Sequence, residues 1–182
     1  MLTVVTSSAD KTREIARILD AEVTNVALDL PEIQSLSYEE VVEAKAREAY
    51  SRLQVPLIVD DAGFSLEGLN GFPGPLTKWL WQAVGWEGVC RIADSLPNRN
   101  ASVTVAIGYF DGTEFKSFIG EAKGTMAEHA RGENGFGHDV IFVHEGDSRT
   151  RAELSIEEQD ARPIRRMALE GLKAYLGERG NL

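Results

Sequence analysis

The sequence predicts an α/β domain with a mixed sheet. Short apolar and β-branched runs alternate along the whole chain with segments whose apolar residues recur at helical spacing. The chain has 182 residues, of which 43% are hydrophobic and 26% charged. This length suits one domain over residues 1–182, with room for two lobes, and the composition is that of a globular protein rather than a disordered one.

The strands are predicted from short apolar runs and from alternation of apolar with polar residues. A hairpin is expected at Asp111-Gly112, because an Asp-Gly pair between two alternating segments favours a tight turn. The segment 61–76 contains several Gly and Pro residues and is expected to be a loop. The predicted strands are residues 2–6, 22–28, 56–60, 102–110, 115–119, 124–128 and 139–143.

The helices are predicted from apolar residues three and four positions apart and from signals at their ends. Ser8 or Asp10 would cap the first helix, and Ser37 with Glu40 forms a capping-box pattern before the second. Pro163 fits the first turn of the last helix. The predicted helices are residues 10–20, 38–53, 77–84, 87–95 and 163–178.

The charge balance and the cysteine count exclude several classes of protein. With 29 acidic and 19 basic residues the formal net charge is −10, which makes the chain a poor binder of nucleic acid or of an anionic membrane. Cys90 is the single cysteine, so an intramolecular disulfide and a cysteine-rich zinc site are excluded. Because the chain also has only three histidines, any metal is expected to be a hard cation held by oxygen. The N-terminus has no basic leader, and no apolar run is long enough to span a bilayer, so we expect a cytoplasmic protein.

Small hydroxyl residues stand at the first strand-to-helix junction, in Thr6-Ser7-Ser8-Ala9-Asp10-Lys11. Backbone N–H groups at a helix N-terminus attract phosphate, and Lys11 adds a positive charge. A plain helix cap with an exposed lysine explains the same residues. Lys45 flanks the inner face of its helix and Lys78 begins an apolar helix, so both suit phosphate oxygens, although isolated lysines more often extend into solvent.

Three acidic residues form a candidate metal site. Asp60 and Asp61 are expected to end an apolar strand, where α/β sheets place their ligands, and Glu32 could add an oxygen from a loop. Adjacent carboxylates are costly unless a cation neutralises them, and Mg²⁺ is normally held by carboxylates together with substrate phosphates. The alternative is a strand-end turn in which Asp60 or Asp61 accepts backbone hydrogen bonds.

Gly135-Phe136-Gly137-His138-Asp139 is the fourth candidate. Glycines on both sides of Phe136 let the backbone bring the ring into a pocket, where it could stack on a base, and Asp139 could accept hydrogen bonds from base N–H groups. A glycine-rich loop around a core phenylalanine explains this segment as well.

In this order and spacing, these segments resemble the inosine triphosphate pyrophosphatase family, which hydrolyses nonstandard purine nucleoside triphosphates (ITP, dITP, XTP). The resemblance covers nearly the whole chain. The motifs that carry it are Thr6–Lys11 with Glu14, Leu30-Pro-Glu-Ile-Gln34, Val59-Asp-Asp-Ala-Gly63, Leu69-Asn-Gly-Phe-Pro-Gly74, Gly120-Glu-Ala-Lys-Gly124, Gly135-Phe-Gly-His-Asp139 and Thr150-Arg-Ala-Glu153.

The resemblance implies an elongated, twisted sheet with helices on both sides, a nucleotide cleft between two lobes, and a homodimer. It also implies Mg²⁺, with Mn²⁺ as the alternative, on Glu32 and Asp61, and a water that Asp61 helps to direct at the α-phosphorus. The products would be a nucleoside monophosphate and pyrophosphate, with Lys11 and Lys45 assisting catalysis. The residues implied to bind substrate are Thr6, Ser7, Ser8, Lys11, Lys45, Ala62, Lys78, Phe136, Gly137, His138, Asp139, Gln159 and Arg165.

The chain departs from the family pattern mainly on the base side. The family has Asn at Ser8 and Ser or Thr at Ala62, while Gln159, Pro163 and Ile164 replace a Lys, a Ser and a His; the Arg at position 165 is kept. In the family the Lys and the His-Arg pair read the purine 6-oxo group, and a site that loses a polar partner loses discrimination. A shifted base preference, a Maf-like or pyrimidine-directed pyrophosphatase, and a catalytically weak nucleotide-binding protein therefore stay open.

Overall fold

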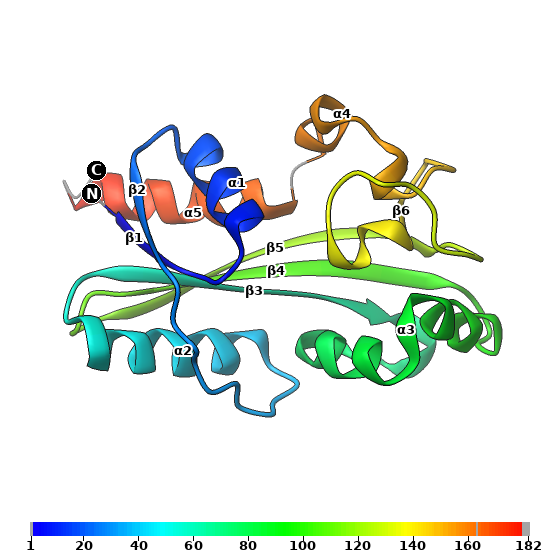
Figure 1. Ribbon diagram of the computed structural model, residues 1–182, viewed down its shortest axis with the longest axis horizontal. Helices are drawn as coiled ribbons and strands as arrows, with labels where there is room; N and C mark the ends of the chain where they lie inside the picture. The colour runs from blue at the N-terminus through cyan, green and yellow to red at the C-terminus, as the bar shows by residue number, and fades with distance from the viewer. Residues whose placement is uncertain (1, 163, 180–182) are drawn as a thin grey trace. The chain divides into compact units, whose positions relative to one another are not determined.

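The computed structural model describes residues 2–162 and 164–179 (Figure 1). Pro163, expected in the first turn of the last helix, lies outside the described residues. The helices and strands are β1 (Leu2–Val5), α1 (Ala9–Leu19), β2 (Val23–Val26), α2 (Tyr38–Leu53), β3 (Leu57–Leu66), α3 (Thr77–Asp94), β4 (Asn100–Phe110), β5 (Phe115–Met126), β6 (Phe142–His144), α4 (Ile156–Asp160) and α5 (Ile164–Glu178). The short 3₁₀ helices are η1 (Glu67–Leu69), η2 (Gly74–Leu76), η3 (Gly137–Val140) and η4 (Arg151–Glu153).

The strands form one six-stranded sheet in the order β2-β1-β3-β4-β5-β6. Strand β1 pairs in parallel with both β2 and β3, whereas β5 pairs antiparallel with β6. The predicted α/β fold with a mixed sheet is therefore confirmed.

Strand β3 is longer than the sequence predicts. The expected loop over 61–76 is wrong in its first part, because the strand continues to Leu66 before two 3₁₀ turns begin. Phe64 and Leu66 are fully buried, and their burial outweighs the turn signal of Gly63. Asp60 and Asp61 consequently lie inside a strand rather than at its end.

The two helices expected at 77–84 and 87–95 are confirmed, because the backbone of α3 is not helical at Gly85, where φ is +68°. Two strand predictions differ from the structure. The strands expected at 115–119 and 124–128 are one strand, β5. The strand expected at 139–143 begins only at Phe142, because the Ile141 N–H donates to His138 O in the tight turn of η3.

The serine N-caps predicted for the first two helices are confirmed. Ser8 is the N-cap of α1, where its side chain accepts from the Lys11 N–H, and Ser37 caps α2 in the same way through Glu40 N–H. The reciprocal half of the predicted capping box is wrong, because the Glu40 carboxylate accepts from the Ser35 hydroxyl instead. Helix α2 has the predicted bounds, 38–53.

The chain divides into two units, each built from separate segments. Unit 1 is Met1–Asp61, Val105–Gly120 and Arg165–Leu182, and unit 2 is Ala62–Thr104 and Glu121–Ile164. Within unit 1, α2 covers one face of the strands, with α1 and α5 on the other (Figure 1). Small residues on α2 let it pack closely, and the core there comprises Val5, Val42, Ala46, Ala49, Leu57, Val59, Ala106 and Phe110.

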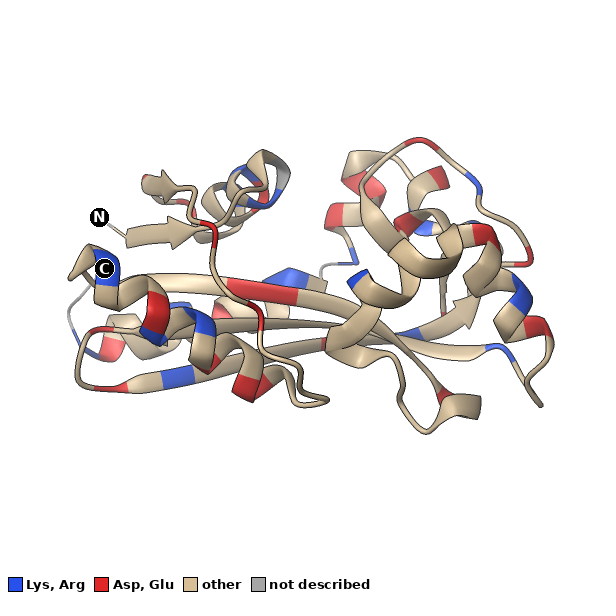
Figure 2. Cartoon of the chain, turned by 60° about the horizontal axis from the view of Figure 1, so that its bottom comes forward, with Lys and Arg blue, Asp and Glu red and all other residues tan. Residues whose placement is uncertain are grey.

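Acidic positions are spread along the helices and loops, with basic positions interspersed (Figure 2). No helix in the described part of the chain is both long and apolar enough to cross a bilayer.

Candidate active site

Unit 1 brings Glu32 and Asp61 together around one ammonium group. The Nζ atom of Lys45 lies 2.7 Å from Asp61 Oδ1 and 3.1 Å from Glu32 Oε1. Lys45 is buried, because it stands on α2 between the core positions Val42 and Ala46. Three residues that are far apart in the sequence thus form one charged cluster, which we call the Lys45 cluster.

Burial and charge compete in the Lys45 cluster. Burial alone would lower the pKa of Lys45, but the carboxylates of Asp61 and Glu32 outweigh it and raise that pKa above its usual value. Lys45 therefore stays charged at neutral pH. Asp61 Oδ2 is buried and has no hydrogen-bond partner within the described residues. Such an oxygen is costly to leave unpaired, so it is suited to a water molecule or a cation.

A second charged cluster, the Arg165 cluster, contains Asp60. Asp60 Oδ2 lies 3.0 Å from Lys11 Nζ and also contacts Arg165 Nη1, while Arg165 Nε donates to Glu14 Oε2 at 2.8 Å. Burial would raise the pKa of Asp60, but the charges of Lys11 and Arg165 outweigh it and lower that pKa to about 2. Because one oxygen of Asp60 already holds two cations, Asp60 is the poorest metal ligand of the three acidic candidates.

The hydroxyl segment before α1 is used mainly to cap the helix. Ser8 Oγ accepts from the Lys11 N–H at 3.3 Å, and Thr6 Oγ1 accepts from the Ser8 N–H at 3.2 Å. Ser7 lies between them at the same strand-to-helix junction. The capped first turn places Lys11 beside Asp60.

Glu32 and Asp61 fit a divalent cation. Their oxygens are hard donors that already converge on a positive charge, and the unpartnered Asp61 Oδ2 is available. Among residues 2–162 and 164–179, no group of three or more His, Cys, Asp or Glu side chains is placed to hold a metal ion. A cation here would therefore take two carboxylates from the protein and its other ligands from phosphate and water, which is how Mg²⁺ is usually bound.

The base-side candidates other than Arg165 lie in unit 2. Phe136 is half-buried at the start of η3, where its N–H donates to Asp139 Oδ2 at 3.0 Å. Asp139 is buried, and its other oxygen lies 3.3 Å from Arg151 Nε. Gly135 has a φ of +82°, and a Cβ there would lie 2.4 Å from Asp139 Oδ2, so this turn requires glycine.

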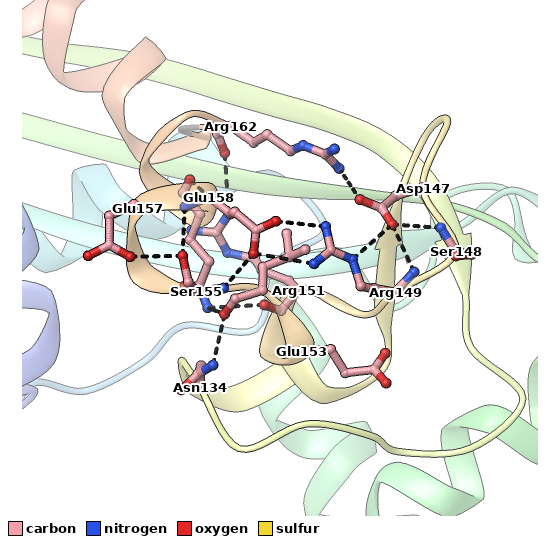
Figure 3. Close-up of polar contacts among 12 residues, drawn as sticks. Asn134, Asp147, Ser148, Arg149, Arg151, Glu153, Ser155, Glu157, Glu158 and Arg162 are labelled. Carbon is pink, nitrogen blue, oxygen red and sulfur yellow. Dashed lines mark hydrogen bonds and ion pairs between the residues drawn. The ribbon is translucent and has the colours of Figure 1, made fainter.

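Arg151 is the residue that sequence reasoning missed. Its Nη1 lies 3.3–3.5 Å from Arg162 O, Gln159 O and His144 Nε2, and its own carbonyl accepts from Gln159 Nε2 at 3.0 Å. The available signal was an arginine in the short motif Thr150-Arg-Ala-Glu153 beside apolar neighbours. Figure 3 also shows an ion-pair group in which Arg149 and Arg162 contact Asp147, and Arg149 contacts Glu158.

The other predicted site residues in unit 2 are Lys78, Gly137, His138, Ala62 and Gln159. Lys78 is exposed, with Nζ 5.9 Å from the centre of the Trp79 ring. His138, beside Gly137 in η3, places its ring 6.4 Å from that of Phe64. Ala62 is partly exposed and directly follows Asp61 on β3. Gln159 is buried, and its amide nitrogen donates to two backbone carbonyls.

A model of the Ham1 family matches residues 2–175. The chain belongs to the Ham1 family. A dITP/XTP pyrophosphatase of Methanopyrus kandleri is 41% identical over 169 residues, which cover 91% of this chain and 90% of that protein. Inosine triphosphate pyrophosphatase 2 of Trypanosoma cruzi is 36% identical over 178 residues, covering 96% of this chain and 91% of that protein. The resemblance seen in the sequence is confirmed.

The fold agrees with that of solved Ham1 proteins. The structure of the Staphylococcus aureus Ham1 protein superposes with a TM-score of 0.81 at 26% identity, covering 98% of this chain and 100% of that one. The Ham1 assignment therefore rests on both sequence and fold.

In this Ham1 chain, replacing Arg151 with Met is expected to destabilise the folded state by roughly 3 kcal/mol, because the buried Asp139 loses its cation. Urea unfolding monitored by circular dichroism would measure the change. Arg149→Met is the matched control, since Arg149 and its partner Glu158 are exposed and Asp147 keeps its ion pair with Arg162. Equal stability of the two variants would contradict the role given to Arg151.

His144 is expected to make the stability of the Ham1 chain pH-dependent. Burial, reinforced by the charges of Arg151 and Arg162, lowers its pKa to about 4. Between the unfolded pKa of about 6.5 and this value, only the unfolded chain takes up the proton, so the free energy of unfolding falls as pH falls through that window. Above a pH of about 6.5, the contribution of the neutral His144 ring to the free energy of unfolding is fully retained.

Lowering the pH from about 7.5 to about 5 should therefore cost wild type up to about 2 kcal/mol more than His144→Gln, which cannot take up that proton. Urea unfolding of both proteins at the two pH values measures the difference. Parallel pH profiles would show that the ring is not held neutral by its surroundings.

Proposed function

We propose that this chain hydrolyses nonstandard purine nucleoside triphosphates (dITP, XTP and ITP) to the nucleoside monophosphate and pyrophosphate. The names of its Ham1 relatives, dITP/XTP pyrophosphatase and inosine triphosphate pyrophosphatase, support this activity. The structural observation that carries the proposal is the Lys45 cluster, in which two carboxylates and a buried lysine converge next to a second lysine-containing cluster.

The charges of the two clusters favour a divalent cation at the proposed site. Lys11, Lys45 and Arg165 supply three positive charges against four carboxylates, which leaves a net charge of −1. A triphosphate would be repelled by such a site in a chain that is itself strongly acidic. Mg²⁺, or Mn²⁺ in its place, held by Glu32 and Asp61, would reverse the sign of the local charge and act as a Lewis acid toward the phosphates.

The side chains of the clusters then have separate roles. The free Asp61 Oδ2 would orient the attacking water toward the α-phosphorus and accept its proton. Lys11 and Lys45, both held by carboxylates, would stabilise the charge on the phosphate oxygens as the bond to pyrophosphate breaks. Holding both ammonium groups in place before the substrate arrives lowers the reorganisation that the reaction requires.

On the base side, Phe136 would stack on the purine, with Asp139 accepting from a base N–H. Each carboxylate oxygen has two lone pairs, so the contacts of Asp139 with Phe136 N–H and Arg151 leave capacity for a further bond. Gln159 would contribute its side-chain oxygen, because its nitrogen is already bonded. We also propose a homodimer, which light scattering after size-exclusion chromatography would test.

Initial rates with dITP, XTP, ITP, dUTP and the common nucleoside triphosphates, in Mg²⁺ or Mn²⁺, test the proposal. Chromatography of the products must identify both the monophosphate and pyrophosphate. The expected result is the highest kcat/KM for dITP, XTP or ITP. Release of orthophosphate instead of pyrophosphate would contradict it, and tight binding without turnover in calorimetry would identify a nucleotide-binding protein.

A further inference from the structure

Arg165 lies in the first turn of helix α5, but its side chain does not reach into solvent. It is only 4% exposed, and its guanidinium bridges two acidic residues of other elements, Glu14 on α1 and Asp60 on β3. A buried arginine held by two carboxylates keeps its charge, since Asp60 and Glu14 outweigh the burial that would lower its pKa.

Asp60 connects Arg165 to Lys11. Both cations contact the same oxygen, Asp60 Oδ2, and Lys11 and Glu14 lie three positions apart on α1, which places them on one side of that helix. Arg165 therefore holds α1 through Glu14 and holds the partner of the Lys11 ammonium through Asp60. Arg165 thus acts on Lys11 indirectly in two ways: it holds the helix that carries Lys11, and it holds the carboxylate that contacts the Lys11 ammonium.

The shared oxygen also sets the charge that Lys11 presents. Without Arg165, Asp60 and Lys11 would form a closed pair in which the carboxylate cancels the ammonium. With Arg165 on the same oxygen, part of the carboxylate charge is already balanced, so Lys11 keeps more of its positive potential for a phosphate group.

We propose that Arg165 is a positioning residue for the phosphate end of the substrate, acting through Asp60 on Lys11. This differs from the base-reading role that the family resemblance implies for position 165. The proposal rests on the proposed function in one respect only, namely that Lys11 contacts the phosphates.

Inorganic tripolyphosphate with Mg²⁺ is the probe that separates the two roles, because it has no base. Its Kd by calorimetry, and its Ki against dITP hydrolysis, should rise roughly 10- to 100-fold in Arg165→Met. The KM values for dITP and dGTP should rise by one common factor, which leaves their kcat/KM ratio unchanged. Arg165→Lys should recover much of the affinity, because it keeps a cation on Asp60.

Three further variants complete the test. Lys11→Met should weaken tripolyphosphate binding similarly, and the double variant should be no weaker than Lys11→Met alone, since both changes act on one contact. Glu14→Gln retains the Arg165–Asp60 contact and should have a smaller effect. Arg165→Gln replaces Arg165→Met if the latter does not fold, as judged by thermal melting.

An unchanged tripolyphosphate Kd in folded Arg165→Met or Arg165→Gln would overturn the proposal, and a changed dITP-to-dGTP ratio would assign Arg165 to the base. Additive losses in the double variant would also overturn it. Because calorimetry does not require turnover, these results stay informative even if the wild-type chain releases no pyrophosphate, a result that would instead count against the proposed function.

Discussion

Replacing Asp61 with Asn is expected to lower kcat for dITP by about 10³-fold, within the range found when a general base is removed. The amide has nearly the same shape but no negative charge, so it can neither accept the proton of the attacking water through Oδ2 nor offer the same charge to a divalent cation. Steady-state release of pyrophosphate at saturating substrate measures the effect. A rate within about two-fold of wild type would reject the role given to Asp61.

The control for this variant is Glu48→Gln. Glu48 is an exposed acidic residue on α2 whose ion pair with Arg52 spans one helical turn on the surface. Both substitutions remove one negative charge, so a change caused by net charge alone would occur in both. Only Asp61→Asn should lose activity, and thermal melting of the two variants would show whether each is folded.

Replacing Lys45 with Met is expected to reduce kcat/KM by about 10²- to 10³-fold and to destabilise the chain by about 3 kcal/mol. The activity falls because a fixed positive charge next to the phosphates is lost. The stability falls because Glu32 and Asp61 are left facing each other, partly or largely buried, without their common partner. The two effects have one cause, the removal of the ammonium on which both carboxylates converge.

Added Mg²⁺ provides a second measurement on this variant. A divalent cation can take the place of the ammonium between the two carboxylates, so millimolar Mg²⁺ should raise the melting temperature of Lys45→Met more than that of wild type. Arg47→Met, on the exposed side of the same helix, is the control and should show neither effect. Equal Mg²⁺ responses of Lys45→Met and wild type would argue against a cation site at Glu32 and Asp61.

Local signals predicted a large part of the fold correctly. Helix α2 has the predicted bounds because its cap, Ser37, and its apolar spacing both lie within a few residues. The extension of β3 could not be predicted in this way, because Gly63 is a turn signal locally while the burial of Phe64 and Leu66 depends on tertiary packing. Local propensity therefore failed where packing decided the structure.

For the candidate site, the sequence predicted several of the residues but not all of the pairs that they form. Residue type and position in the chain selected Glu32, Lys45 and Asp61, which the structure brings together. The pairing of Arg165 with Asp60 and of Arg151 with Asp139 could not be predicted, because no periodic pattern connects residues that are distant in the sequence. The structure was needed to show that both arginines are buried among carboxylates and backbone oxygens.

The long separation between Arg165 and its partners has a consequence for synthesis on the ribosome. Glu14 and Asp60 precede Arg165 by 151 and 105 residues, so both carboxylates are translated long before the guanidinium that joins them. A nascent chain that has emerged only to β6 cannot yet close the cluster around Asp60, because Lys11 has emerged and Arg165 has not. The Arg165 cluster, which is proposed to position the phosphates, should therefore be complete only after translation has ended and α5 has left the exit tunnel.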